Sequence, residues 1–79
     1  MKGIDEKRWK EAIYMASDRT GKSMEQLSLD AGFCNVYLYN SINKHSTPKP
    51  EMIRYICLKA KCRTDWVFGL TNIKEADKI

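Results

Sequence analysis

Residues 24–43 of this 79-residue chain read MEQLSLDAGFCNVYLYNSIN, and this stretch decides the fold. Its apolar spacing predicts two short helices joined by a tight turn at Gly32, because glycine accommodates the backbone conformations that such turns need. We expect the second of these helices to run from about residue 35 to residue 42. Leu38 and Ile42 lie one helical turn apart and would face inward, which leaves most other side chains of that helix facing outward.

The helices up to this turn carry start and end signals. The segment 5–20 has Asp5 as a candidate N-cap and Gly21 just past its end. Ser23 can cap the following helix, and Gln26 stands where its side chain could reach back, as in a capping box. The apolar stripe of the first helix consists of Trp9, Ala12, Ile13 and Ala16.

Two further helices are predicted in the second half of the chain. Pro50 suits the first position of a helix that runs to about residue 60. A short helix at 65–68 then stops at Gly69. The inner stripe of the longer helix consists of Ile53, Ile56, Cys57 and Ala60.

These elements predict one small all-α protein without strands. We expect a compact five-helix domain at residues 1–70, followed by a tail at 71–79 that either takes part in dimer formation or is disordered. Apolar residues make up 43% of the chain, which suffices for a packed core, but no apolar run is long enough to span a bilayer. Because the N-terminus, MKGIDEKRWK, lacks the apolar centre of a secretion signal, we expect a cytoplasmic protein with no membrane partner.

The reactive residue types form no catalytic or metal-binding pattern. Three cysteines are present, and four residues separate Cys57 from Cys62; His45 is the single histidine, so the ligands for a zinc site are lacking. An odd number of cysteines without a secretion signal predicts reduced thiols that act as small apolar fillers. We expect no enzymatic activity, cofactor or small-molecule substrate, because no paired carboxylates or nucleophile motif accompany the histidine.

The distribution of charge is more informative than the formal net charge of +4. No acidic residue occurs between Asp30 and Glu51, whereas Lys44, His45 and Lys49 fall in that interval. An anionic phosphate backbone would be tolerated along this stretch.

With these features the chain resembles the Cro-like or lambda-repressor-like helix-turn-helix regulators of phages and bacteria. The resemblance covers residues 5–70, with the helix-turn-helix at residues 24–43. Ser28, Gly32 and Leu38 stand at the small-residue, turn and locking positions of the motif. The ending Asp-Trp-Val-Phe-Gly at 65–69 is similar to that of phage-repressor domains.

The resemblance implies a DNA-binding transcriptional repressor, associated with the bacterial nucleoid, that occupies a near-palindromic operator as a homodimer. The residues implied to read base edges are Asn35, Val36, Tyr37, Tyr39 and Asn40. Those implied to contact phosphate are Ser23, Met24, Asn43, Lys44, His45 and Lys49. Those expected in the dimer interface are Val67, Leu70 and Ile73. For Tyr37 packing over a neighbouring helix is an equal alternative, and Trp66 is expected to be mostly core.

The chain departs from the family at three positions or segments. Met24 stands where many members have Gln, and Lys61 stands where a helix-ending Gly is common. The expected recognition helix has no Arg or Lys, so the commonest guanine contact is absent. An alternative function is therefore a protein-interaction module on the same scaffold, antitoxin-like or anti-repressor, because tyrosines also make good protein anchors.

Overall fold

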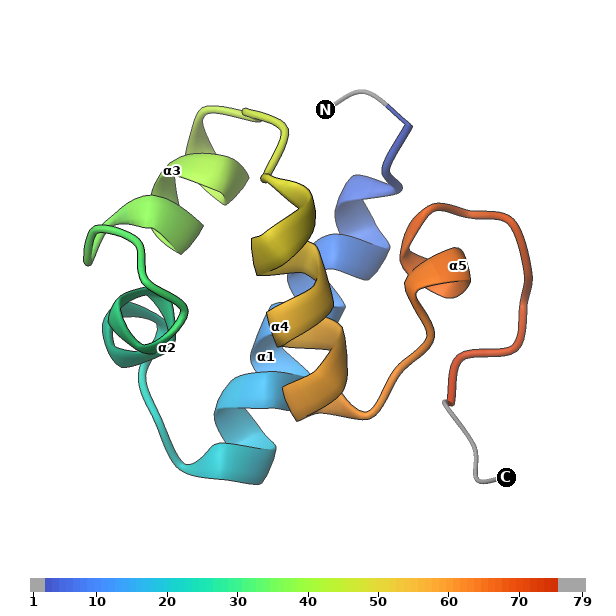
Figure 1. Cartoon of the computed structure of the whole chain (residues 1–79). Coiled ribbons are helices and arrows are strands. Elements are labelled where there is room, and N and C mark those ends of the chain that lie inside the picture. Colours follow the sequence, from blue (N-terminus) through green and yellow to red (C-terminus); the bar gives the residue numbers. More distant parts are fainter. Residues whose placement is uncertain (1–2, 76–79) are drawn as a thin grey trace.

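The computed structural model describes residues 3–75, and within that range the chain is all-helical with no β-strand. The five helices are α1 Glu6–Thr20, α2 Met24–Asp30, α3 Tyr37–Asn43, α4 Pro50–Ala60 and α5 Thr64–Val67. Figure 1 shows α1 and α4 in the middle of the molecule, with α2 and α3 on one side and α5 on the other. The all-α prediction is confirmed. Among the described helices, none combines the length and apolar character that crossing a membrane requires.

The core lies where the two predicted apolar stripes meet. Helix α1 packs along α4, and every member of both stripes is buried. The predicted caps are also confirmed: Asp5 Oδ1 accepts from the amides of Lys7 and Arg8 at 3.1 and 3.2 Å, and Gly21 is left-handed with φ 71°. Both tryptophans belong to this core, since Trp9 and Trp66 expose 0% and 6% of their surface.

Three local predictions differ from the structure. Helix α3 begins at Tyr37, two residues later than expected, because a turn closed by the Tyr37 amide and the Cys34 carbonyl at 3.1 Å precedes it. The capping box at α2 is only half formed. Ser23 Oγ accepts from the Gln26 amide at 3.2 Å, but the Gln26 side chain donates forward to Asp30 at 2.8 Å. Helix α5 is shifted by one residue toward the N-terminus.

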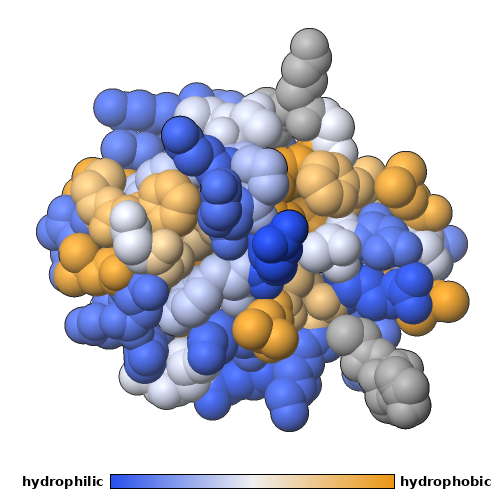
Figure 2. All heavy atoms as spheres, viewed as in Figure 1, coloured by the Kyte–Doolittle hydropathy of each residue, from blue (hydrophilic) through white to orange (hydrophobic). Residues whose placement is uncertain are grey.

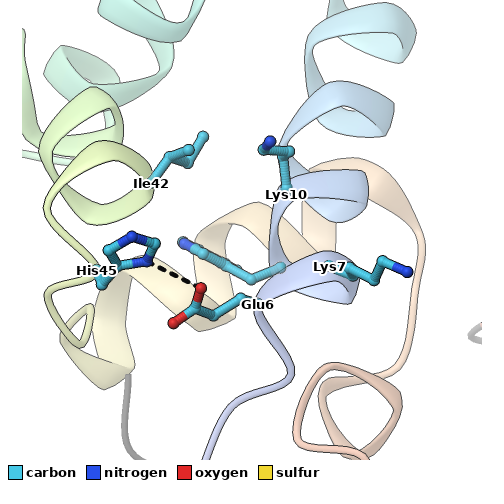
Figure 3. Close-up of a pocket in the computed structure, with 6 residues that line it drawn as sticks. Glu6, Lys7, Lys10, Ile42 and His45 are labelled. Carbon is cyan, nitrogen blue, oxygen red and sulfur yellow. Dashed lines mark hydrogen bonds and ion pairs between the residues drawn. The ribbon is translucent and has the colours of Figure 1, made fainter.

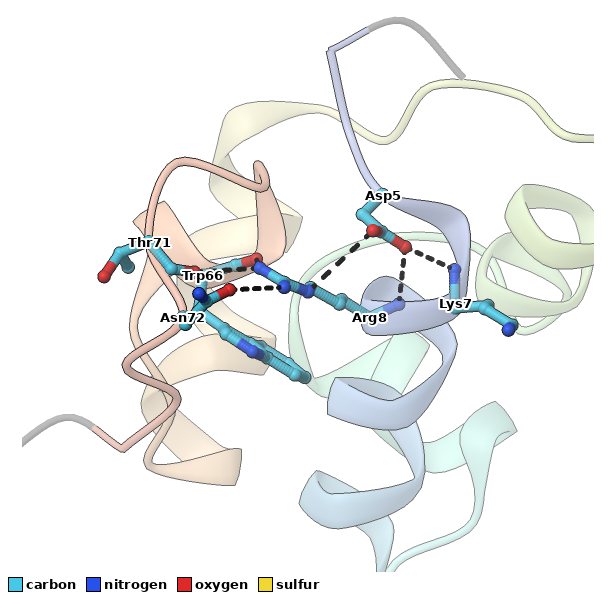
Figure 4. A network of polar contacts seen from close by, with 6 residues as sticks. All are labelled: Asp5, Lys7, Arg8, Trp66, Thr71 and Asn72. Atoms are coloured by element: carbon cyan, nitrogen blue, oxygen red, sulfur yellow. Dashed lines mark hydrogen bonds and ion pairs between the residues drawn. The ribbon is translucent and has the colours of Figure 1, made fainter.

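The chain after α5 is held on the helical domain by Arg8 of α1. Figure 4 shows the Arg8 guanidinium between Asp5 and this segment, donating to the carbonyls of Trp66 and Thr71, each at 2.9 Å, and to Asn72 Oδ1 at 3.2 Å. The same guanidinium lies 5.3 Å from the centre of the Trp66 ring. The described part of the predicted tail, 71–75, is thus tied to α1; residues 76–79 lie outside the described residues.

Candidate nucleic-acid interface

Helices α2 and α3 are joined through the buried hydroxyl of Ser28. Its Oγ donates to the Met24 carbonyl at 2.9 Å and accepts from the Leu38 amide at 3.2 Å. Helix α3 has no side-chain cap of its own, so its first turn presents amides without partners inside the helix. Because Ser28 satisfies one of those amides from α2, it fixes where α3 begins relative to α2.

A second buried hydroxyl connects α3 to α1. Ser41 Oγ accepts from Trp9 Nε1 at 3.1 Å and donates to the Leu38 carbonyl at 2.8 Å. Ser28 therefore binds the backbone amide of Leu38, and Ser41 binds its backbone carbonyl. The two serines are 0% and 1% exposed. Among the described residues, every buried side-chain nitrogen and oxygen has a hydrogen-bond partner. The sequence analysis missed Ser41, because a serine inside a helix is ordinarily an exposed residue.

The turn between α2 and α3 depends on the backbone freedom of glycine. Gly32 has φ 90°, a conformation that L side chains rarely adopt. The Gly32 and Phe33 amides then donate to the carbonyls of Leu29 and Ser28, at 2.9 and 3.0 Å. This geometry satisfies the end of α2 and turns the chain into α3, as the sequence predicted.

The outward side of α3 and the turn before it carries four of the five predicted base-reading residues. Val36 and Tyr39 are 43% and 46% exposed, Asn35 is exposed and Asn40 is half-buried. Within residues 3–75, the side chains of Asn35, Tyr39 and Asn40 make no hydrogen bond to another described residue. The structure therefore places Tyr39 and Asn40 on a helix that is held from behind, with Asn35 in the turn before it, and leaves their polar groups available to a ligand.

Tyr37 has a different position from those four residues. Its half-buried ring lies 4.4 Å, centroid to centroid, from that of Phe33, and its hydroxyl accepts from the Lys49 amide at 2.7 Å. Tyr37 thereby fixes the loop that follows α3. This is the packing role that the sequence left open, although the hydroxyl hydrogen can still donate to an outside acceptor.

The end of α3 and the loop after it contain four exposed residues predicted to contact phosphate: Asn43, the last residue of α3, and Lys44, His45 and Lys49. His45 has φ 54°, and its Nδ1 lies 2.9 Å from Glu6 Oε1, at the start of α1 (Figure 3). The hydrogen bond with His45 lowers the pKa of the Glu6 carboxyl below its ordinary value. The stretch without acids in the sequence therefore has an acidic neighbour in space, Glu6, which anchors the loop to α1.

A lysine of α1 that was not predicted from the sequence lies close to this loop. Lys7 and Lys10 line a hollow of about 160 Å³ together with Ile42 and His45 (Figure 3). Figure 3 shows the Lys7 ammonium pointing away from His45, whereas Lys10 lies on the side of α1 that faces α3. In the sequence Lys10 is an ordinary member of the polar face of α1, and the packing of α1 on α3 brings it near the predicted phosphate contacts.

The other predicted phosphate site is the start of α2. Ser23 is exposed and Met24 half-buried, and the first amides of α2 have no acceptor inside the helix. An ion pair lies nearby: Lys22 Nζ is 2.5 Å from Asp30 Oδ2. Their hydrogen bond raises the pKa of Lys22 and lowers that of Asp30, to which Gln26 also donates.

The prediction of Val67 as a dimer contact is wrong. Val67 is 0% exposed because its side chain is part of the chain's own core. Its backbone carbonyl accepts a hydrogen bond from the Asp5 amide. Leu70 and Ile73 are 79% and 62% exposed, and their role between subunits stays a prediction. Figure 2 shows apolar atoms gathered on the α2–α3 side and around α5 with the chain that follows, with hydrophilic residues between them.

Comparison of the chain with models of protein families, with curated proteins and with solved structures gives no significant match. Any functional assignment of this surface therefore depends on the chemistry of its own residues.

Proposed function

We propose that this chain is a sequence-specific double-stranded DNA-binding regulator whose α3 enters the major groove. One observation carries the proposal. Tyr39 and Asn40 on α3, and Asn35 in the turn before it, offer polar groups without described partners, and Ser28 and Ser41 hold α3 from behind. An α-helix with its side chains is about 10–12 Å across, and the major groove is about 12 Å wide.

The residue types on α3 suit contacts with A·T-rich sequence. An asparagine amide can donate to and accept from adenine at once, and Val36 can contact the methyl group of thymine. The helix lacks arginine and lysine, so guanine would contribute little through direct side-chain contacts.

Affinity would come mainly from the cations around α3. Lys44 and Lys49 are exposed beside it, and Lys10 adds charge from α1. Contacts of these lysines with phosphate would release counterions and make binding sensitive to salt. Leu70 and Ile73 would support a homodimer that places two α3 helices roughly 34 Å apart on a near-palindromic operator, and occupancy of that site would repress transcription, as in a phage or prophage repressor.

A salt series with a random-sequence duplex, read by fluorescence anisotropy, tests the DNA-binding claim. Affinity should fall steeply with salt, and Lys44→Ala should reduce the slope of log K against log salt by about 0.9, the share of one phosphate contact. Arg19→Ala is the matched control, because Arg19 lies about 20 Å further along α1 than Glu6. It removes the same charge and should leave the slope unchanged.

Absence of binding at low salt would sink the DNA-binding proposal. It would favour the second function, a protein-interaction module, for which the exposed side chains of Val36 and Tyr39 would be the anchors. Equal slopes for Lys44→Ala and Arg19→Ala would show instead that DNA binds through another surface.

A further inference from the structure

The end of α4 brings two cysteines together that look unrelated in the sequence. Residues five apart in a continuous helix point about 140° away from each other, at 100° per residue. Here Lys61 adopts the left-handed conformation, with φ 58°, and reverses the chain. The Cys62 amide donates to the Cys57 carbonyl at 3.1 Å, and the Lys61 amide donates to the Leu58 carbonyl at 3.4 Å.

These two hydrogen bonds define a Schellman ending, in which the side chains at the positions of Cys57 and Cys62 contact each other. A disulfide requires Cα atoms within about 4.4–6.8 Å of each other. Cys57 and Cys62 are joined by a backbone hydrogen bond of 3.1 Å and by a hydrogen bond between their thiols. Both thiols are reduced and buried, exposed by only 3% and 4%.

Both cysteines nevertheless line an open cleft of about 490 Å³ between the end of α4 and the start of α5. Arg54, Lys61 and Arg63 also line it. The cleft therefore brings solvent against both residues, although each exposes only a small part of its surface, and this favours a small reagent over a bulky one.

The two thiols are chemically unequal. A hydrogen bond from the Cys57 thiol, together with the charge of Lys74, lowers the pKa of Cys62. The same hydrogen bond and burial raise the pKa of Cys57. Cys62 is therefore the better nucleophile, and Cys57 is placed to attack it afterwards.

We propose that Cys57 and Cys62 form a redox-active dithiol that a small hydroperoxide converts to an intrachain disulfide. The Cys62 thiolate attacks a peroxide oxygen, so that an S–O bond forms, the O–O bond breaks and the departing hydroxide takes up a proton to give water. Cys57 then loses its proton and attacks the Cys62 sulfur, so that the S–S bond forms and the S–O bond breaks to release a second water. Two thiols lose two electrons, and hydrogen peroxide is reduced to two waters.

The full-length Cys34→Ser variant tests this proposal, because it removes the exposed thiol and leaves the core unchanged. The reduced variant is treated with hydrogen peroxide, unfolded, alkylated and weighed. The proposal predicts a monomer lighter by about 2 Da, with no thiol to alkylate, a Cys57–Cys62 linked peptide and full reversal by dithiothreitol. If both thiols are still alkylated after peroxide treatment that fully oxidises Cys34 in the wild type, or are found only as sulfinic and sulfonic acids, the proposal is overturned.

Single substitutions in the Cys34→Ser background test the order of attack. With Cys57→Ser, a sulfenic acid at Cys62 should accumulate and be trapped by dimedone. With Cys62→Ser, oxidation of Cys57 should be slower by at least about tenfold. Equal rates would contradict the assigned roles. Should either variant fail to fold, the result with Cys34→Ser alone still decides whether the disulfide forms.

Discussion

Replacing Ser41 by alanine should destabilise the whole domain, although only one oxygen atom is lost. Ser41 Oγ is the acceptor for the indole N–H of Trp9, and both residues are buried, at 1% and 0% exposure. Alanine is nearly the same size, so little cavity forms. The indole N–H, in contrast, is left in the core without an acceptor.

The expected cost follows from that orphaned donor. Leaving a buried polar group unpaired costs about 1–3 kcal/mol. In a domain of this size, each kcal/mol lowers the melting temperature by about 4–8 °C. The assay is urea unfolding followed by circular dichroism, in which the midpoint should fall while the slope m stays unchanged.

Two controls separate this explanation from a general effect of losing a serine. Ser46→Ala alters an exposed serine in the loop after α3 and should change the free energy of unfolding by no more than about 0.5 kcal/mol. In a Trp9→Phe background the indole N–H is absent, so Ser41→Ala should cost much less than in the wild type. If Ser41→Ala is as mild as Ser46→Ala, or if its cost is the same in both backgrounds, the unpaired indole N–H is not the cause of the destabilisation.

Three further predictions concern the ends of helices and the clamp on the chain after α5. A lysine at position 8 cannot reproduce the forked contacts of Arg8 to Trp66, Thr71 and Asn72, so Arg8→Lys should lower the free energy of unfolding by about 1–2 kcal/mol. It should also speed hydrogen exchange of the Arg63 amide, which donates to the Lys74 carbonyl. Unchanged exchange at Arg63 would contradict the clamp. Lys61→Gly should stabilise the domain by about 0.5–1 kcal/mol in urea unfolding, because it removes the backbone strain of a lysine in the left-handed conformation. Lys59→Gly, inside α4, should instead destabilise the domain by about 1 kcal/mol. The same sign for both variants would contradict this explanation. Because the folded-state pKa of Asp30 is lowered, its stabilisation is present above its unfolded pKa of about 4 and is lost as the pH falls through the folded value. The difference in melting temperature between wild type and Lys22→Gln should therefore shrink as the pH is lowered below about 4. A difference that does not change with pH would rule out the Asp30 pair as its source.

The helices were predictable because their signals are local. Asp5 and Ser23 cap α1 and α2, Pro50 begins α4, and the stripes on α1 and α4 become the core. Each of these features depends on residues a few positions apart, where the 3.6-residue period and the cap preferences apply directly.

The features that the sequence did not reveal depend on contacts between distant segments. The buried hydroxyl of Ser41 pairs with Trp9 of α1, which is 32 positions away in the sequence. Arg8 has the sequence pattern of a surface charge, and its contacts come from the chain after α5. Val67 is apolar near the end of a short helix, where a core contact and a dimer contact give the same pattern. The pairing of Cys57 with Cys62 requires the left-handed backbone conformation at Lys61, and the presence of a lysine there does not predict that conformation.

Selection of binding sites from a pool of random duplexes tests most directly whether α3 reads DNA. We predict enrichment of an A·T-rich inverted repeat with half-site centres roughly 34 Å apart. Asn35→Ala with Asn40→Ala should abolish this enrichment while non-specific binding survives. Arg19→Ala, at the end of α1 away from the loop after α3, should preserve it. If no motif is enriched, or if the motif persists without the two α3-side asparagines, the claim that this surface reads base sequence is wrong.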